Sequence, residues 1–432
     1  MLFKDIAIID ENLDYKEHQW VGILGDAIDY IGAEEPADAA RYGEVYDGSG
    51  KMLMSAFYNA HSHAPMTLLR GYAENLPLQA WLEQKCWPFE GKMTGEDNYW
   101  ATLLAGAEML RYGVVSFSDM YYHTPARAKA VDEIGMKANL CTSPIAFEPK
   151  PIQEYDVFSE MEDGVANVDG MAGGRIKFEG CIHAEYTNND VTAKSVFDWA
   201  KANNTRMHVH VSETESEVAG CRERHDGMSP VQWLESLGAF DVPAIAAHCV
   251  WVDDDDIAIL AKHGVTVAHN PASNMKLSSG FAPVAKMIDT GVNVALGTDG
   301  MASNNNHDMF QDMYLMALLP KGSQLDPTLI TPKQALNAAT RAGALAQGRE
   351  DCGLLKEGFK ADLCVLDVSG TSWCPVNDML TNVVYAGHGS DVVLTMCDGE
   401  VVYRDGSWPK IDIERVKSEV VERTKRIQAE LA

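Results

Sequence analysis

Eight short apolar runs alternate with longer amphipathic segments between about residues 51 and 300, and this alternation constrains the fold more than any other feature. The runs cover residues 52–60, 114–120, 138–147, 176–184, 206–212, 244–251, 265–270 and 292–299. Helix-like segments lie between them, including residues 99–113, 126–135, 193–204, 229–238, 255–264 and 283–291. Because near-continuous apolar strands need helices on the faces of their sheet, the pattern predicts a parallel α/β fold.

The fold class that we predict is α/β, with a (β/α)8 TIM-type barrel as its main part. A doubly wound open sheet is the principal alternative. Two observations favour the barrel: the runs number eight, and ionisable residues follow them at their carboxyl ends, where barrel active sites form. No GxGxxG motif follows a run, which argues against a dinucleotide-binding sheet.

Both ends of the chain differ from the central pattern. Residues 1–50 and 355–410 contain short alternating runs separated by Gly, Asp and Asn, which is typical of antiparallel strands. We therefore expect a small β-sandwich domain built from these N- and C-terminal segments. The catalytic barrel is expected over residues 51–354 and an amphipathic C-terminal helix over residues 411–432.

The formal net charge of -28 limits the kinds of molecule that the chain can bind. The negative electrostatic potential around such a chain repels nucleic acid and anionic membrane surfaces. We therefore expect a small-molecule substrate, no nucleic acid and no membrane partner. The N-terminus has no basic region before an apolar stretch, and no uncharged segment is long enough to cross a bilayer. These features predict a cytoplasmic protein and are compatible with a homo-oligomer.

The nine cysteines are scattered and include no CxxC pair, so we interpret them as reduced packing residues. Cys249 lies beside His248, and a nucleophilic thiol is the alternative there. A buried thiol is the favoured interpretation.

Residues that can bind a metal follow four of the predicted strands. In a closed barrel all carboxyl ends meet at one mouth, so residues far apart in the chain become neighbours. Each residue alone also fits a core histidine or a turn aspartate, but four such placements together favour a functional site. The residues are His61 and His63, His208 and His210, His248, and Asp299.

Three imidazoles and one carboxylate suit one divalent metal ion. Zn²⁺ is the first choice, although such a nitrogen and oxygen set also accepts Fe²⁺, Mn²⁺ or Co²⁺. Zinc lowers the pKa of water from 15.7 to roughly 7, so the site predicts hydrolysis, with Asp299 as ligand and proton carrier. His208 and His210 share one strand face, and spacing alone does not decide which of them ligates.

Glu213 follows the strand that carries these two histidines. A partly desolvated Glu has a raised pKa, so its carboxyl can protonate a ring nitrogen of a substrate. The alternative is a carboxylate at the N-terminus of a following helix, within residues 212–215.

Five motifs carry a family resemblance: HSHAPMTLLRGYAENLPLQAWLEQKCWPFE, HVSETE, AAHCVW, HNPASNMKLSSGFAPV and GTDGMASNNNHDMF. With them the chain resembles the amidohydrolase superfamily, most closely its branch of 5'-methylthioadenosine/S-adenosylhomocysteine deaminases. The resemblance runs from about residue 50 to the C-terminus. The motifs are less specific for the substrate, since triazine hydrolases and guanine or pterin deaminases share much of the frame.

The resemblance implies a metal site and a catalytic set. Metal ligation is implied for His61, His63, His210 and Asp299, which selects His210 over His208. His248 is implied to orient the water, and Glu213 to transfer the proton at the purine ring nitrogen, with Asp299 as the third catalytic residue.

The resemblance also implies substrate contacts. Glu90 would hold ribose hydroxyls, Trp87 would form an apolar wall, and His183 would bind the purine ring. Binuclear relatives carry a carboxylated bridging lysine at a strand end. Lys177 lies too early in its strand for that role, so one metal ion is expected.

Two departures from the family pattern concern the substrate pocket. Where the family commonly has the proline of HAPYT, this chain has Glu185, which places an additional acid near the expected pocket. Relatives that accept S-adenosylhomocysteine can carry arginines after the third strand for its carboxylate. Residues 141–160 contain no arginine, and only Lys150 is available. This weakens S-adenosylhomocysteine as the substrate relative to adenosine or 5'-methylthioadenosine.

We therefore predict a metal-dependent hydrolytic deaminase of adenine nucleosides, which converts adenosine, 5'-methylthioadenosine or S-adenosylhomocysteine to the inosine analogue and ammonia. The alternative is an amidohydrolase that acts on another aminated heterocycle, of the guanine, pterin or triazine type. A non-catalytic barrel scaffold is a third hypothesis, which the joint presence of ligands and acid–base residues opposes.

Overall fold

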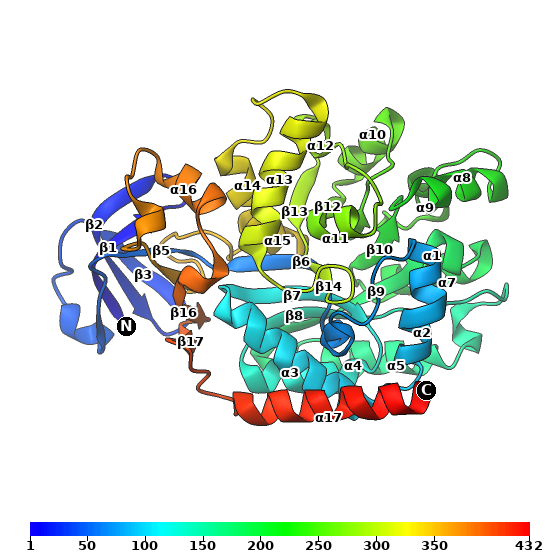
Figure 1. Ribbon diagram of the computed structural model, residues 1–432, viewed down its shortest axis with the longest axis horizontal. Helices are drawn as coiled ribbons and strands as arrows, with labels where there is room; N and C mark the ends of the chain where they lie inside the picture. Colours follow the sequence, from blue (N-terminus) through cyan, green and yellow to red (C-terminus); the bar gives the residue numbers. More distant parts are fainter.

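Eight parallel strands form a closed ring in the structure, a computed structural model that describes residues 1–432. The strands hydrogen-bond in chain order, and β14 (Asp299–Gly300) follows the last of them and pairs with the first, which closes the ring. The strands are β6 (Phe57–His63), β7 (Val114–Tyr121), β8 (Lys137–Thr142), β9 (Ile176–Ala184), β10 (Met207–Val211), β11 (Ala244–His248), β12 (Thr266–His269) and β13 (Asn293–Leu296). The predicted barrel is confirmed (Figure 1).

Helices connect the strands of the ring, and local sequence signals mark their ends. In α9 (Pro230–Leu237) the Ser229 hydroxyl accepts a hydrogen bond from the backbone N–H of Gln232, and Gly238 ends the helix in the left-handed region at φ 86°. The other helices up to the last barrel strand are α1 (Leu78–Trp81), α2 (Trp87–Glu90), α3 (Gly95–Arg111), α4 (Thr124–Ile134), α5 (Val157–Asp163), α6 (Met171–Gly174), α7 (Asp190–Ala202), α8 (Glu215–Arg224), α10 (Asp254–His263), α11 (Pro271–Lys276) and α12 (Val284–Asp289). Those that follow are α13 (Met309–Gln324), α14 (Pro332–Ala339), α15 (Arg341–Ala346), α16 (Met379–Tyr385) and α17 (Ile413–Leu431).

A second sheet is assembled from both ends of the chain, as expected. Its order is β17-β16-β15-β5-β1-β2-β3, with β4 paired to β1. A separate hydrophobic core combines side chains of the two segments, such as Phe3 and Leu363. Figure 1 shows the blue and orange parts of this sheet together at one side of the barrel. The strands are β1 (Leu2–Ile9), β2 (Tyr15–Leu24), β3 (Ala27–Gly32), β4 (Val45–Asp47), β5 (Lys51–Ser55), β15 (Leu363–Asp367), β16 (Val392–Cys397) and β17 (Glu400–Arg404).

The first apolar run, residues 52–60, divides between the two sheets. β5 pairs with β1 and β15 in the terminal sheet, whereas β6 begins the barrel at Phe57. The chain therefore enters the barrel later than the expected boundary at residue 51. The hydrophobic pattern does not mark this change, because both strands are buried almost throughout.

The C-terminal helix α17 packs against α3 along one side of the barrel (Figure 1). Arg426 Nη2 donates to Asp97 Oδ2 at 2.6 Å, and Arg423 Nη1 donates to Asp97 Oδ1 at 3.2 Å. No helix combines the length and the apolar character that crossing a bilayer requires.

Lys137 links the barrel to the terminal sheet. It is the first residue of β8 and is 3% exposed, and its Nζ donates to Asp362 Oδ1 at 2.5 Å and to Asp398 Oδ1 at 2.6 Å. The hydroxyl of Tyr58 in β6 also donates to Asp362. Burial raises the pKa of the Asp362 carboxyl, but the charge of Lys137 and the hydrogen bonds outweigh this and lower it.

The variant Lys137→Met should destabilise the protein, because it leaves Asp362 buried without its cation. Breaking a buried ion pair in this way costs roughly 3–5 kcal/mol. Thermal unfolding followed by circular dichroism should show a clearly lower midpoint, and adding Asp362→Asn should restore part of the loss. An unchanged midpoint for Lys137→Met would contradict this role.

Candidate metal centre and active-site pocket

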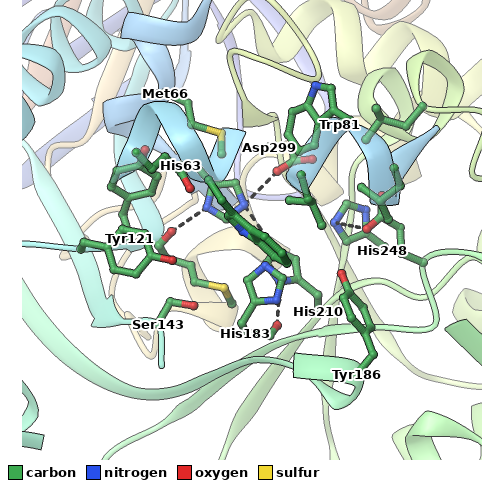
Figure 2. A pocket seen from close by; sticks show the side chains of 18 residues that line it. His63, Met66, Trp81, Tyr121, Ser143, His183, Tyr186, His210, His248 and Asp299 are labelled. Atoms are coloured by element: carbon green, nitrogen blue, oxygen red, sulfur yellow. Dashed lines mark hydrogen bonds and ion pairs between the residues drawn. The ribbon is translucent and has the colours of Figure 1, made fainter. Parts of the chain in front are cut away.

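Histidines from three strands and one aspartate meet at the carboxyl end of the barrel (Figure 2). Two overlapping groups have potential ligand atoms within 4.8 Å of one another. One group is His61, His63 and His210, and the other is His61, His248 and Asp299. All of these side chains are buried.

The three imidazoles of the first group are held by their Nδ1 atoms. His63 Nδ1 donates to the carbonyl of Met120 at 2.6 Å, and His210 Nδ1 donates to the carbonyl of His183 at 2.7 Å. His61 Nδ1 lies 2.9 Å from Nε2 of His208. These contacts leave the Nε2 atoms directed toward one another, as in protein metal sites where the second nitrogen is held by a hydrogen bond.

The chemistry of this donor set fits a divalent metal ion. Nε2 of His61 is fully buried and has no hydrogen-bond partner, which is costly unless a cation occupies the position beside it. Burial lowers the pKa of His61 to about 4 and that of His210 well below its usual value, so both rings are neutral and can offer a lone pair. Burial also opposes protonation of His63, yet Asp299 raises its pKa to about 9. A bound cation would replace this pairing.

Asp299 supplies the carboxylate of the cluster. Its Oδ1 lies 3.2 Å from Nε2 of His63 and 3.4 Å from Nε2 of His61, and its Oδ2 accepts hydrogen bonds from Ser273 at 2.6 Å and Ser303 at 3.0 Å. Burial raises the pKa of this carboxyl, but its contacts with His61 and His63 outweigh burial and hold the pKa well below its usual range. Asp299 is therefore an anion that faces the imidazoles.

The structure separates His208 from His210. Both lie on the inner face of β10, but His210 Nε2 is 3.2 Å from His63 Nε2, whereas His208 lies deeper in the barrel behind His61. This geometry favours His210 as the ligand. His208 instead contacts Nδ1 of His61 and so helps to orient that ring.

Left-handed backbone conformations, which are uncommon for residues other than glycine, occur at several strand ends of the barrel. Ser212, His248 and Asp299 have φ values of 51°, 73° and 59°. Such strain is retained where the surrounding structure fixes the residue, and it is concentrated at functional sites. Here it occurs at the ends of strands that deliver side chains to the pocket.

Glu213 and His248 lie together beside the cluster. Oε2 of Glu213 is 3.9 Å from Nε2 of His248, while Oε1 accepts a hydrogen bond from Ser279 at 3.2 Å. Nδ1 of His248 donates to Asn274 Oδ1 at 2.8 Å. Burial raises the pKa of the Glu213 carboxyl, partly opposed by the charge of His248, and a raised pKa suits a carboxyl that donates a proton to a substrate.

Glu213 does not cap the following helix, which was the alternative. Thr214 is the N-cap of α8 and accepts from the backbone N–H of Glu217. The Glu217 carboxylate in turn accepts from the backbone N–H groups of Ser212 and Glu213 at 2.8 and 2.7 Å. These bonds leave the Glu213 carboxyl on the pocket wall.

The pocket above the cluster is mainly apolar and aromatic and contains no lysine or arginine. Its wall includes the three residues assigned to substrate by resemblance, Trp87, Glu90 and His183. Burial raises the pKa of the Glu90 carboxyl, opposed by contact with Tyr121. The remaining lining residues are His63, Met66, Leu78, Trp81, Leu82, Met120, Tyr121, Tyr122, Ser143, Tyr186, His210, Glu213, His248, Leu277 and Asp299.

Several of these pocket residues are absent from the sequence prediction. Tyr121, Tyr122 and Tyr186 each lie at or just after the end of a barrel strand, so the rule that located the histidines applies to these aromatic residues as well. Trp81 and Leu82 come from the long segment after β6, where no local signal indicates which side chains face the pocket.

Glu185 does not add an acid to the pocket, and this expectation was wrong. Its carboxylate accepts from Arg224 Nε at 2.9 Å and Nη2 at 2.6 Å, and Oε1 lies 2.8 Å from Nε2 of His225. The next residue, Tyr186, lines the pocket instead. Cys249 is fully buried, and burial raises the pKa of its thiol well above the usual value, which favours packing over nucleophilic catalysis.

Comparison with known proteins gives a consistent family assignment. Residues 52–402 match the Amidohydrolase family. A protein of Acetivibrio thermocellus named 5-methylthioadenosine/S-adenosylhomocysteine deaminase is 41% identical over 429 residues, which are 98% of this chain and 98% of that protein. A protein of Methanosarcina mazei named 5'-deoxyadenosine deaminase is 43% identical over 375 residues, with coverage of 87% and 86%.

A solved structure supports the same assignment. The crystal structure of an adenosine deaminase from Xanthomonas campestris with bound zinc superposes with a TM-score of 0.92 at 30% sequence identity. The superposition covers 99% of this chain and 98% of that one.

The His210→Gln variant should lose bound metal, because it removes one of the three converging Nε2 atoms. The His208→Gln variant should still bind one metal ion per chain when zinc is saturating, since His208 supports His61 from behind and loss of such support weakens affinity by about 10- to 100-fold. Metal content measured by plasma mass spectrometry after dialysis against zinc checks both. Full occupancy in His210→Gln together with loss in His208→Gln would reverse the assignment.

Proposed function

We propose that this chain removes the 6-amino group of an adenine nucleoside by hydrolysis. The proposal starts from the family: the chain belongs to the amidohydrolase family and is an aminohydrolase. The observation that carries this proposal is the convergence of three Nε2 atoms and the Asp299 carboxylate at the floor of a pocket that Glu213 also lines. We assign metal binding to His61, His63, His210 and Asp299. Zinc is the metal that we propose, as in the solved relative with bound zinc.

Different residues around the cluster carry out the individual proton transfers of the reaction. A bound zinc ion would supply a water nucleophile near neutral pH. Glu213, whose pKa is raised by burial, delivers a proton to the ring nitrogen next to the amino-bearing carbon. Asp299 and His248 receive one proton of the attacking water and pass it to the amino group, which leaves as ammonia. The remaining hydroxyl proton returns to Glu213 as the carbonyl of the inosine product forms.

Glu90, His183 and Trp87 bind the substrate in this proposal. The half-buried Glu90 carboxyl lines the wall, and such an acceptor suits the adjacent hydroxyls of a ribose. His183 contributes its ring to the same wall, and Trp87 adds apolar area for a base or a 5' substituent. A ribose-binding carboxylate favours a nucleoside over a free guanine, pterin or triazine, which form the second candidate class.

The charge of the pocket further restricts the substrate. The lining includes the carboxylates of Glu90, Glu213 and Asp299 but no lysine or arginine, so a substrate carboxylate finds no partner there. Apolar side chains such as Met66, Leu78 and Trp81 suit a small 5' substituent. We therefore propose adenosine, 5'-methylthioadenosine or 5'-deoxyadenosine as better substrates than S-adenosylhomocysteine.

We also propose a cytoplasmic location for the protein and a small molecule as its only partner class, with no nucleic acid or membrane partner. The net charge of -28, which repels anionic polymers and surfaces, supports this proposal. Assembly into a homo-oligomer is compatible with it.

An ammonia-release assay tests the substrate class. Adenosine, 5'-methylthioadenosine and 5'-deoxyadenosine should be deaminated with kcat/KM at least about tenfold above that for S-adenosylhomocysteine, the factor for 1.4 kcal/mol of lost binding. Guanine, pterins and triazines serve as comparison substrates. Preference for one of these heterocycles would contradict the nucleoside assignment, and preference for S-adenosylhomocysteine would contradict the charge argument.

The Glu213→Gln variant should lower kcat by about 10²–10⁴-fold, the range expected for loss of a general acid. Glu215 provides a matched control, because it is an exposed glutamate in the first turn of α8, and Glu215→Gln should have near-normal turnover. Steady-state kinetics with the preferred nucleoside compares them. A near-normal rate for Glu213→Gln with full metal content would remove Glu213 from the mechanism.

A further inference from the structure

Three cationic side chains converge at the end of the barrel opposite to the pocket. Lys177 is the second residue of β9, Arg206 directly precedes β10, and Arg349 follows α15. Lys177 and Arg206 both lie close to Gly348: a methyl group added there would be 3.1 Å from Arg206 Nη1 and 3.5 Å from Lys177 Nζ. The amino-terminal ends of two adjacent strands therefore carry neighbouring positive charges.

These side chains line two adjoining cavities. Lys177, Arg206 and Gly348 line a cavity of about 450 Å³. Arg349 lines a second cavity of about 210 Å³, which shares Lys177 and Gly348 with the first. The space around the three cations is thus large enough for a small anion and for a group attached to it.

Two of the cations have buried donors without partners. Nε of Arg206 and Nε of Arg349 are both buried and make no hydrogen bond. Arg349 is only 5% exposed, and its Nη2 is held by the carbonyls of Ala138 and Arg175 at 3.2 and 2.8 Å and by Asn139 Oδ1 at 3.0 Å. Buried guanidinium N–H groups are rarely left unpaired, and an ion or ordered water commonly accounts for such cases.

The acids near this cluster neutralise it only in part. Glu179 is the buried carboxylate, and its Oε1 is 3.6 Å from Arg206 Nε but accepts a hydrogen bond from Asn139 at 2.6 Å. Its Oε2 lies 3.8 Å from Nδ1 of His208, in the interior of the barrel. Asp169 is exposed, and its Oδ1 accepts from the backbone N–H of Phe178. Three cations therefore face one buried carboxylate.

The other charged groups of the second cavity are paired or exposed. Lys137 is neutralised by Asp362 and Asp398, Arg175 pairs with Asp132, and Lys360 pairs with Asp26. Asp351 is exposed. Burial, together with the charges of Arg349 and Arg206, lowers the pKa of Lys177, as expected for a local excess of positive charge. The chain as a whole has a net charge of -28, so this local excess is opposite in sign to the overall charge.

We propose that Lys177, Arg206 and Arg349 form a second binding site, which takes a tetrahedral oxyanion of the phosphate class. A phosphate group accepts several charge-assisted hydrogen bonds at once, and two guanidinium groups with one ammonium group provide them. The cavity leaves room for a free phosphate or for the phosphate of a nucleotide. This site is independent of the proposed deaminase function, since none of its residues lines the substrate pocket.

Calorimetric titration of the zinc-loaded enzyme with inorganic phosphate tests the proposal, with chloride at matched ionic strength as the reference. The wild type should bind phosphate and show a higher unfolding midpoint in its presence, because a ligand of the native state stabilises that state. The double variant Lys177→Gln/Arg206→Gln should bind at least about tenfold more weakly, because it loses two charge-assisted contacts. Lys417→Gln, which changes an exposed cation of α17, should bind as the wild type does.

A parallel titration with adenosine 5'-monophosphate distinguishes the two sources of phosphate. Tighter binding of the nucleotide that is lost in the double variant assigns the site to a nucleotide, whereas equal affinities assign it to free phosphate. Retained nucleoside turnover in the double variant confirms that it is folded. Absence of phosphate and nucleotide binding in the wild type, or equal binding of both by wild type and double variant, would overturn the proposal.

Discussion

The pairing of β14 with β6 is the constraint on which the site depends. It closes the ring and places Asp299 opposite Ser62 and Gly300 opposite His63, so the carboxylate of the last strand faces the histidines of the first. A methyl group on Gly300 would lie 2.4 Å from the sulfur of Met66 and 3.3 Å from Cβ of His63. A side chain at position 300 would therefore require the Met66 side chain to move, whereas glycine leaves room for the close approach of β14 to β6. Without this closure the Asp299 carboxylate and the Nε2 atoms of His61 and His63 would not meet.

Polar side chains continue from this mouth through the interior of the barrel. Arg206 directly precedes β10, and His208 and His210 are alternate residues within it. All three lie on one face of the strand, from the cation cluster at one end of the barrel to the proposed metal ligands at the other. His208 contacts His61 on one side and approaches Glu179 on the other. Barrel interiors are usually packed with branched apolar residues. The polar groups here require partners at each level, which restricts the orientation of the imidazoles that we propose as metal ligands.

The sequence predicted the barrel and the strand-end histidines because the alternation of eight apolar runs with helix-like segments, and the convergence of strand ends at one mouth, follow from the chain pattern itself. Strand spacing did not distinguish His208 from His210, since both share a strand face and only their depth differs; the family resemblance made that selection. The position of Glu185 depended on Arg224, a contact between distant elements that no local pattern encodes. The sequence also did not show that residues 51–55 belong to the terminal sheet and not to the barrel, because β5 and β6 are equally apolar.

Anomalous diffraction from crystals of the zinc-loaded protein, collected at the zinc absorption edge, tests the central claim most directly. One anomalous peak per chain is expected, within ligand distance of Nε2 of His61, His63 and His210 and of the Asp299 carboxylate. Another cluster of potential ligands exists at Glu185, Cys221 and His225, where Arg224 already neutralises the carboxylate. A peak at that cluster instead, or no peak at the barrel mouth, would contradict the account.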